Sequence, residues 1–163
     1  MAASSAGERG QVAVYAVVLF PLLMLVVALV LAVGSLEMLR SRLRAQLDMA
    51  ALTATQAIDL GTLARGGQPA LVPAKAEALA REYLAGNLAA LGDQLLVAPD
   101  AVARTAEVAV SNRPGTDPIT GLPITAPTVS IRVVVPVEIP LLGLAGLGTR
   151  VDLELTGSAA ARS

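Results

Sequence analysis

The chain contains no cysteine and no histidine, and each absence excludes a class of chemistry. Without cysteine there is no disulfide framework, no thiolate nucleophile and no cysteine-zinc site. Without histidine there is neither an imidazole base nor the commonest metal ligand. The acidic residues are scattered and form no recognisable pair for carboxylate catalysis. We therefore expect a protein that is not an enzyme and that has no cofactor and no metal site.

Aromatic residues and charge are also scarce. The chain has one Phe, two Tyr and no Trp, so it offers few rings on which bases or sugars could stack. Charged residues make up 15% of the chain and the net charge is -1, which gives no general attraction for a polyanion. We expect no nucleic-acid partner.

What the sequence does have is one long hydrophobic run, from Val12 to Val33, without a charged residue. At about 1.5 Å per residue, a helix of this length covers roughly the hydrocarbon layer of a bilayer. Lipid offers no hydrogen-bond partner to free amides, so a helix is the structure expected there. The run predicts a transmembrane helix over residues 11–36, preceded at residues 1–10 by a short leader or cytoplasmic tail.

Several residues of the run bear on how this helix would pack. Small residues allow another helix to approach closely, and Ala28 and Ala32 have small-xxx-small spacing. Tyr15 is expected to lie at the membrane interface, and Pro21 is expected to kink the helix. The predicted helix-packing residues are Ala13, Tyr15, Pro21, Ala28, Ala32 and Gly34.

Helical periodicity continues beyond the hydrophobic run, over residues 37–60. Apolar residues recur there at three- and four-residue steps, while the charged residues fall elsewhere on the helical wheel. No Gly or Pro interrupts the pattern before Gly61, a typical C-terminal stop signal. We predict an amphipathic continuation of the same helix, with an apolar stripe of Leu36, Leu39, Leu43, Leu47, Ala50, Ala54 and Ile58.

Residues 61–163 are expected to form a small head. Pro73 opens a second amphipathic helix, predicted to run to Leu91. Further along, apolar residues alternate with polar ones, which indicates strands. The connection at residues 112–127 is rich in proline and is predicted to be an exposed, irregular loop. The predicted strands are residues 102–111, 128–139 and 150–156.

A leucine-rich segment between the last two predicted strands is unusual, because turns are normally polar. Its leucines are Leu141, Leu142, Leu144 and Leu147. An apolar hairpin tip of this kind is explained by contact with a neighbouring subunit or with the membrane surface. It is equally explained by a loop that folds back onto its own core.

The N-terminal region resembles the TadE/TadG-like proteins, the pseudopilin-like components of tight-adherence (Flp) pilus machinery. The resemblance rests on an Arg-Gly pair before the hydrophobic run, on a proline some ten residues further on, and on an alanine-rich segment after the run. The matching positions are Arg9, Gly10, Val12, Ala13, Val14, Pro21, Leu43, Asp48, Ala50, Ala51 and Leu52. The resemblance implies a pilin-like α+β fold, in which a long N-terminal transmembrane helix continues into a head of one further helix and an antiparallel sheet of about three strands.

The same resemblance implies partners and a processing site. In prepilin-like members a peptidase cuts after the glycine of the leader, which corresponds here to Gly10 and Gln11. Such members commonly carry a glutamate five residues past that glycine, which is thought to pair with a neighbour's new N-terminal amine. Tyr15 occupies that position here, so cleavage by a prepilin peptidase and retention of an uncleaved anchor both stay open.

Orientation in the membrane is predicted differently by two arguments. Arg40, Arg42 and Arg44 follow the hydrophobic run, while Arg9 precedes it, and the positive-inside rule would therefore place the head in the cytoplasm. The resemblance implies the opposite, with the N-terminus cytoplasmic and the head outside. We adopt the latter, which predicts a bacterial envelope protein, either with a single span in the inner membrane or in an extracellular filament.

Two functions of different classes fit these features. The first is a structural or assembly subunit of a pilus-like surface filament, packed through its N-terminal helix against further copies or against other pilus-assembly subunits. The alternative is a monomeric, membrane-anchored binding module outside the cytoplasm. The first predicts a regular polymer containing the chain, whereas the second predicts a dispersed monomer.

Overall fold

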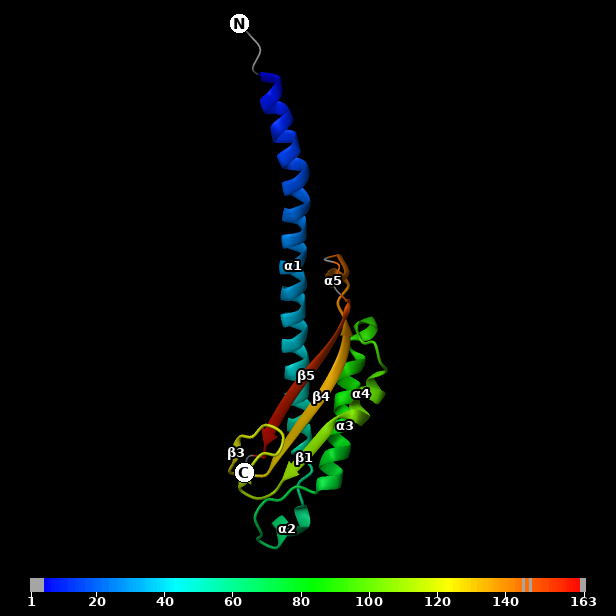
Figure 1. The fold of residues 1–163 in the computed structure, drawn as a ribbon. Coiled ribbons are helices and arrows are strands. Elements are labelled where there is room, and N and C mark those ends of the chain that lie inside the picture. Colours follow the sequence, from blue (N-terminus) through cyan, green and yellow to red (C-terminus); the bar gives the residue numbers. More distant parts are fainter. Residues whose placement is uncertain (1–4, 145, 147, 162–163) are drawn as a thin grey trace. The chain divides into compact units, whose positions relative to one another are not determined.

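The computed structural model describes residues 5–144, 146 and 148–161, and of residues 5–14, 16, 93, 141 and 144 it describes the backbone alone. These residues fall into two compact units. Of these residues, the first unit contains 5–37, 139–144, 146, 148 and 149, and the second contains 38–138 and 150–161. Figure 1 shows the elements in sequence colours. The predicted fold class is confirmed: a long N-terminal helix, further helices and an antiparallel sheet of three strands.

Helix α1 runs from Ser5 to Ala54 and includes Pro21 within it. Its apolar residues from Val17 to Val33 are largely exposed, whereas the later stripe is buried from Leu39 to Ala54 and half-buried at Leu36 and Ile58. Leu43 and Leu47 have no exposed surface, and neither do Ala50 and Ala54. The spacing of the stripe therefore predicted correctly which side of the helix the second unit covers.

The helix ends earlier than the sequence predicted, at Ala54 rather than Leu60. The Thr55 hydroxyl donates a hydrogen bond to the Leu52 carbonyl, and Ile58 forms an antiparallel bridge with Leu71. Helix α2, Leu60–Ala64, then begins at an Asp59 cap whose carboxylate accepts hydrogen bonds from the amides of Gly61 and Thr62. A side-chain cap and a bridge thus replace the predicted last turns of α1.

The sheet of the second unit has the strand order β1-β4-β5, all antiparallel. Strand β4, Thr128–Glu138, lies between β1, Glu107–Ser111, and β5, Arg150–Ala160 (Figure 1). The register opposes Ile131 to Gly157. Because side chains alternate across a strand, the odd-numbered residues of β4 and β5 share one face; those of β4 are Val129, Ile131, Val133, Val135 and Val137, and all are buried.

Helices cover part of this unit's core. Helix α3, Pro73–Ala89, buries Ala76, Ala80, Leu84 and Leu88 and contacts β1. A 3-10 turn, Gly92–Gln94, follows it. Helix α4, Pro99–Thr105, contacts α3 and β4. The sequence predicted a strand from residue 102, which is wrong for the first residues of that range, because Pro99 at the first helical turn and Asp100 behind it start a helix.

The proline-rich connection is more ordered than predicted. Strands β2, Gly115–Thr116, and β3, Pro123–Ile124, pair antiparallel, and the turn between them buries Asp117 and Ile119. The Asn112 side chain accepts a hydrogen bond from the Leu71 amide at 2.7 Å and donates one to the Leu71 carbonyl at 2.9 Å. Polar side chains thus fix a segment that proline content alone presented as irregular.

The leucine-rich tip belongs to the first unit. Helix α5, Pro140–Leu144, opens it, and the Ile139 amide donates a hydrogen bond to the Thr149 carbonyl at 2.7 Å, which closes the tip at its base. Ile139 is buried and Leu142 is half-buried. Leu147 lies outside the described residues, as do the side chains of Leu141 and Leu144. The predicted contact of the tip with a subunit or a membrane stays a prediction.

Candidate functional site

The largest exposed apolar surface belongs to α1. Between Val17 and Val33 its valines, leucines, phenylalanine and methionine are 43% to 73% exposed. Among the described residues, α1 is the one helix that is long and apolar enough to cross a membrane, judged by length and composition. An apolar surface of this extent indicates contact with lipid or with another protein.

The predicted helix-packing residues differ in how accessible they are. Tyr15 and Pro21 are exposed, and Ala28 is half-buried. Ala32 is 1% exposed, so the chain itself already covers it. Gly34 is open, with no atom within 4 Å of the position that a β-carbon would take.

Two further predictions fall where side chains are not described. Gly10 and Gln11 lie in the first turns of α1 by their backbone, and Ala13 follows in the same helix. Their side chains lie outside the described part of the chain, so the predicted cleavage site and the packing role of Ala13 stay predictions.

Gly157 of β5 lets α1 approach the sheet closely, a role that was not predicted from the sequence. A β-carbon at this position would lie 2.9 Å from the Leu47 β-carbon, 2.8 Å from the Asp48 carboxylate and 3.1 Å from the Asp48 amide. Real β-carbons essentially never make contacts under 3.0 Å, so only glycine fits between the strand and the helix. The predicted strand ended at residue 156, four residues before the end of β5, and so left Gly157 out. A glycine inside an alternating pattern is a known signal for close backbone approach.

A second contact holds the same part of α1 from another element. The Asn87 side-chain amide on α3 donates a hydrogen bond to the Gln46 carbonyl at 3.3 Å. Together with the Gly157 approach, this contact fixes the amphipathic half of α1 within the head. The buried stripe is consequently occupied by the chain itself, and it is not available to a partner.

Arg132 joins the three strands on the other face of the sheet. Its guanidinium lies 3.3 Å from the Glu107 carboxylate on β1 and 3.7 Å from the Glu154 carboxylate on β5. It also donates a hydrogen bond to the Ile119 carbonyl at 2.7 Å. Because all three charged groups are more than a third exposed, solvent screening keeps the ion pairs weak. The bond to Ile119 attaches the connection between β1 and β4 to this face.

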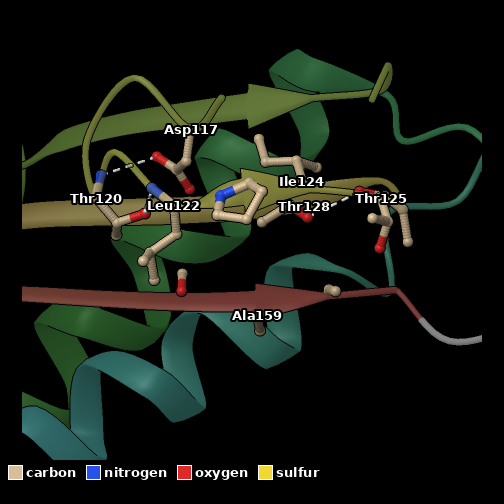
Figure 2. A pocket seen from close by; sticks show the side chains of 11 residues that line it. Asp117, Thr120, Leu122, Ile124, Thr125, Thr128 and Ala159 are labelled. Atoms are coloured by element: carbon tan, nitrogen blue, oxygen red, sulfur yellow. Dashed lines mark hydrogen bonds between the residues drawn. The ribbon is translucent and has the colours of Figure 1, made fainter. Parts of the chain in front are cut away.

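Asp117 organises that connection and borders a pocket of about 180 Å³ (Figure 2). Its carboxylate accepts hydrogen bonds from the amides of Ile119 at 2.8 Å and Thr120 at 3.0 Å. Burial would raise the pKa of Asp117, but hydrogen bonds from Thr120, Ser130 and Ile119 outweigh it and hold that pKa below its ordinary value. The carboxylate is therefore satisfied by its own turn and by Ser130 of β4.

The other lining residues of this pocket are threonine, serine, proline and small or branched apolar residues. A neighbouring pocket of about 310 Å³ contains Arg44 and Asp48 beside Thr120 and Ser158. Among the described residues, no group of three or more Asp or Glu side chains is placed to hold a metal ion. The clearest structural feature is α1, which has an exposed apolar part and a later part whose apolar stripe is buried.

These features define a class: an α+β head with one helix suited to a membrane. Residues 10–65 match the family described as "Putative Flp pilus-assembly TadE/G-like". Over this region the chain is similar to that family, which confirms the resemblance seen in the sequence. The match covers the apolar and amphipathic parts of α1 and the start of the head, less than half of the chain. No curated protein and no solved structure matches it.

Proposed function

We propose that the chain is a non-enzymatic structural or assembly subunit of a pilus-like surface filament, anchored and packed through α1. The observation that carries this proposal is the division of α1 into an exposed apolar part and a part whose apolar stripe is buried by the head. The family match over residues 10–65 supports a role in Flp pilus assembly and a position in the membrane of the cell envelope.

The mechanism is an exchange of neighbours for the exposed part of α1. In the membrane, lipid covers the apolar side chains between Val17 and Val33. In an assembly, helices of other subunits take the place of lipid, and van der Waals packing decides the balance because lipid and leucine are equally apolar. Gly34, open on its surface, would allow the closest approach between two such helices.

The head would remain folded through this exchange. Leu43 and Leu47 are buried by the second unit itself, and Asn87 and Gly157 hold the helix there. Subunit contacts through α1 are therefore expected in its N-terminal part. The head surface would supply the outward face of the assembly.

Cysteine cross-linking in bacterial membranes tests the proposal, because the chain has no cysteine of its own. A single Val30→Cys substitution places a thiol on the span at a residue that is 65% exposed. The matched control is Val134→Cys on the head, where the same residue type is 50% exposed. Under mild oxidation we expect covalent dimers, or adducts with another pilus subunit carrying a cysteine, for Val30→Cys in preference to Val134→Cys.

The result separates the two candidate functions. Equal cross-linking at Val30→Cys and Val134→Cys would indicate random collision. Cysteine would then be placed singly at Val26, Val27 and Val33 as well, and the absence of cross-links at all four positions of the span would contradict packing through it. A chain found solely as a detergent-dispersed monomer, and missing from surface filaments seen by electron microscopy and mass spectrometry, would favour the membrane-anchored binding module.

Processing is a separate part of the proposal. Cleavage by a prepilin peptidase would leave a mature chain that begins at Gln11, and replacement of Gly10 by a bulky residue would block it. Intact-mass measurement of the purified chain decides this point. A mature mass that does not change with the Gly10 substitution, beyond the mass of the new side chain, would exclude cleavage there, although it would leave the packing role of α1 standing.

A further inference from the structure

Arg40, Arg42 and Arg44 follow the apolar part of α1 within a few residues, and all three are exposed. No salt bridge within 4.0 Å involves any of them in the described part of the chain. The acidic residues that flank them on the helix are Glu37 and Asp48, both exposed. Arg44 borders the pocket that Asp48, Thr120 and Ser158 also line, whereas Arg40 and Arg42 present two positive charges to the surroundings within one turn of helix.

Helix geometry places the first of these arginines at the depth of lipid headgroups. Because α1 is continuous here, about 10 Å of helix rise separates Val33 from Arg40. The polar layer on each side of a bilayer is roughly 5 to 8 Å thick. Helical side chains tilt toward the N-terminus, which is here the membrane side, and long basic side chains reach back to the interface. The Arg40 guanidinium can thus reach a phosphate.

The angular positions indicate a surrounding partner and not a single bound molecule. At about 100° per residue, Arg40 lies on one side of the buried stripe of Leu39 and Leu43, and Arg42 lies on the other. A discrete anion would be gripped from one side. A lipid leaflet meets the helix on both.

We propose that Arg40 and Arg42, here named the arginine collar, bind the phosphates of anionic phospholipids in the leaflet that borders the head. Planar guanidinium groups donate paired hydrogen bonds to phosphate oxygens and remain charged. The collar would hold the subunit at a fixed depth before assembly. This inference rests on the membrane anchoring in the proposed function, but it does not depend on filament formation.

Reconstitution of the full chain provides the test. The chain is inserted into vesicles of phosphatidylcholine, with or without phosphatidylglycerol, and the lipids retained after detergent extraction are counted by native mass spectrometry. The collar variant is Arg40→Gln/Arg42→Gln. The matched control is Arg65→Gln/Arg104→Gln, which removes the same charge from exposed positions of the head.

We expect the wild type and the control to retain phosphatidylglycerol in preference to phosphatidylcholine. The collar variant should lose this preference by at least about fivefold, the effect of one basic residue near an anionic surface. Raising the salt concentration should lower the preference of the wild type in the same way. Inorganic phosphate, added at the concentration of the anionic headgroups, should leave it unchanged.

Three outcomes would overturn the collar alone. These are an unchanged preference in the collar variant, an equal loss in the control, or abolition of the preference by inorganic phosphate. Flotation of the vesicles distinguishes them from failure of the anchoring itself. If the wild-type chain does not float with vesicles of either composition, both the anchoring and the collar are refuted.

Discussion

Gly157 is the position at which the packing of the head can be tested most sharply. A Gly157→Ala substitution adds one β-carbon between β5 and α1, at 2.9 Å from the Leu47 β-carbon and 3.1 Å from the Asp48 amide. The 2.8 Å contact with the Asp48 carboxylate can relax by side-chain rotation, but the other two involve a buried residue and the helix backbone. Overpacking of this kind costs typically about 1 to 3 kcal/mol.

An opposing effect is smaller. Replacing glycine by alanine restricts the unfolded chain and by itself stabilises by about 0.5 to 1 kcal/mol. The net expectation for Gly157→Ala is a loss of up to about 2.5 kcal/mol, which lowers the melting temperature of a domain of about 100 residues by up to roughly 10 to 20 °C. Gly157→Val should cost more, because two further carbons enter the same space.

Gly86 is the matched control, with the opposite expected sign. It lies in α3, and a β-carbon added there would have no atom within 4 Å. Gly86→Ala should stabilise the head by about 0.5 to 1 kcal/mol through helix propensity. Pulse proteolysis of the full chain in detergent, over a urea series, measures both free energies of unfolding. A Gly157→Ala variant as stable as Gly86→Ala would refute the close approach of α1 and β5.

Two further substitutions test the core and the buried turn by the same assay. Leu43→Ala should lower the free energy of unfolding by about 2 to 5 kcal/mol because it leaves a cavity. Its control is Leu52→Ala, at a residue that is 49% exposed, which should change that free energy by less than about 1 kcal/mol. Equal effects of the two substitutions would contradict the assigned helix face. Asp117→Ala should cost about 2 kcal/mol at neutral pH. The folded pKa of Asp117 is lowered from 3.8, so its stabilisation is complete above about pH 3.8 and is lost as the pH falls through the folded pKa. The difference in free energy of unfolding between wild type and Asp117→Ala should therefore shrink in acid. A difference that stays constant with pH would contradict the role assigned to the Asp117 carboxylate.

The long-range pattern of the chain was predictable because it is periodic. A run without charge and an apolar stripe at helical spacing identify both parts of α1, since each follows from one repeated physical requirement. The same holds for β4 and β5, where Val133 and Leu155 fall on one face as their alternation predicted. Repetition over many residues averages out local exceptions.

The errors fall where one residue decides the outcome. The alternation near Val102 indicated a strand, but Pro99 started a helix in which Val102 and Ala103 are buried side by side. The end of α1 depended on a local bond from Thr55. The ordered turn around Asp117 depended on side-chain bonds within a segment whose prolines indicated irregular structure. Such contacts leave no periodic trace in the sequence.

The exposed apolar surface of α1 explains why this helix needs lipid or another protein around it. From Val17 to Val33, 14 large apolar side chains are exposed by more than two fifths. Removing each of these side chains from water stabilises by about 1 kcal/mol, which is less than the full burial of a leucine. The sum over all of them exceeds about 10 kcal/mol. That is comparable with the entire stability of a small domain, so a state with this surface in water is strongly disfavoured. Lipid and the helices of other subunits both remove it from water at similar cost, and exchange between them needs little driving force. Packing details such as the open Gly34, and headgroup contacts such as those of Arg40, are then large enough to decide which neighbour α1 takes.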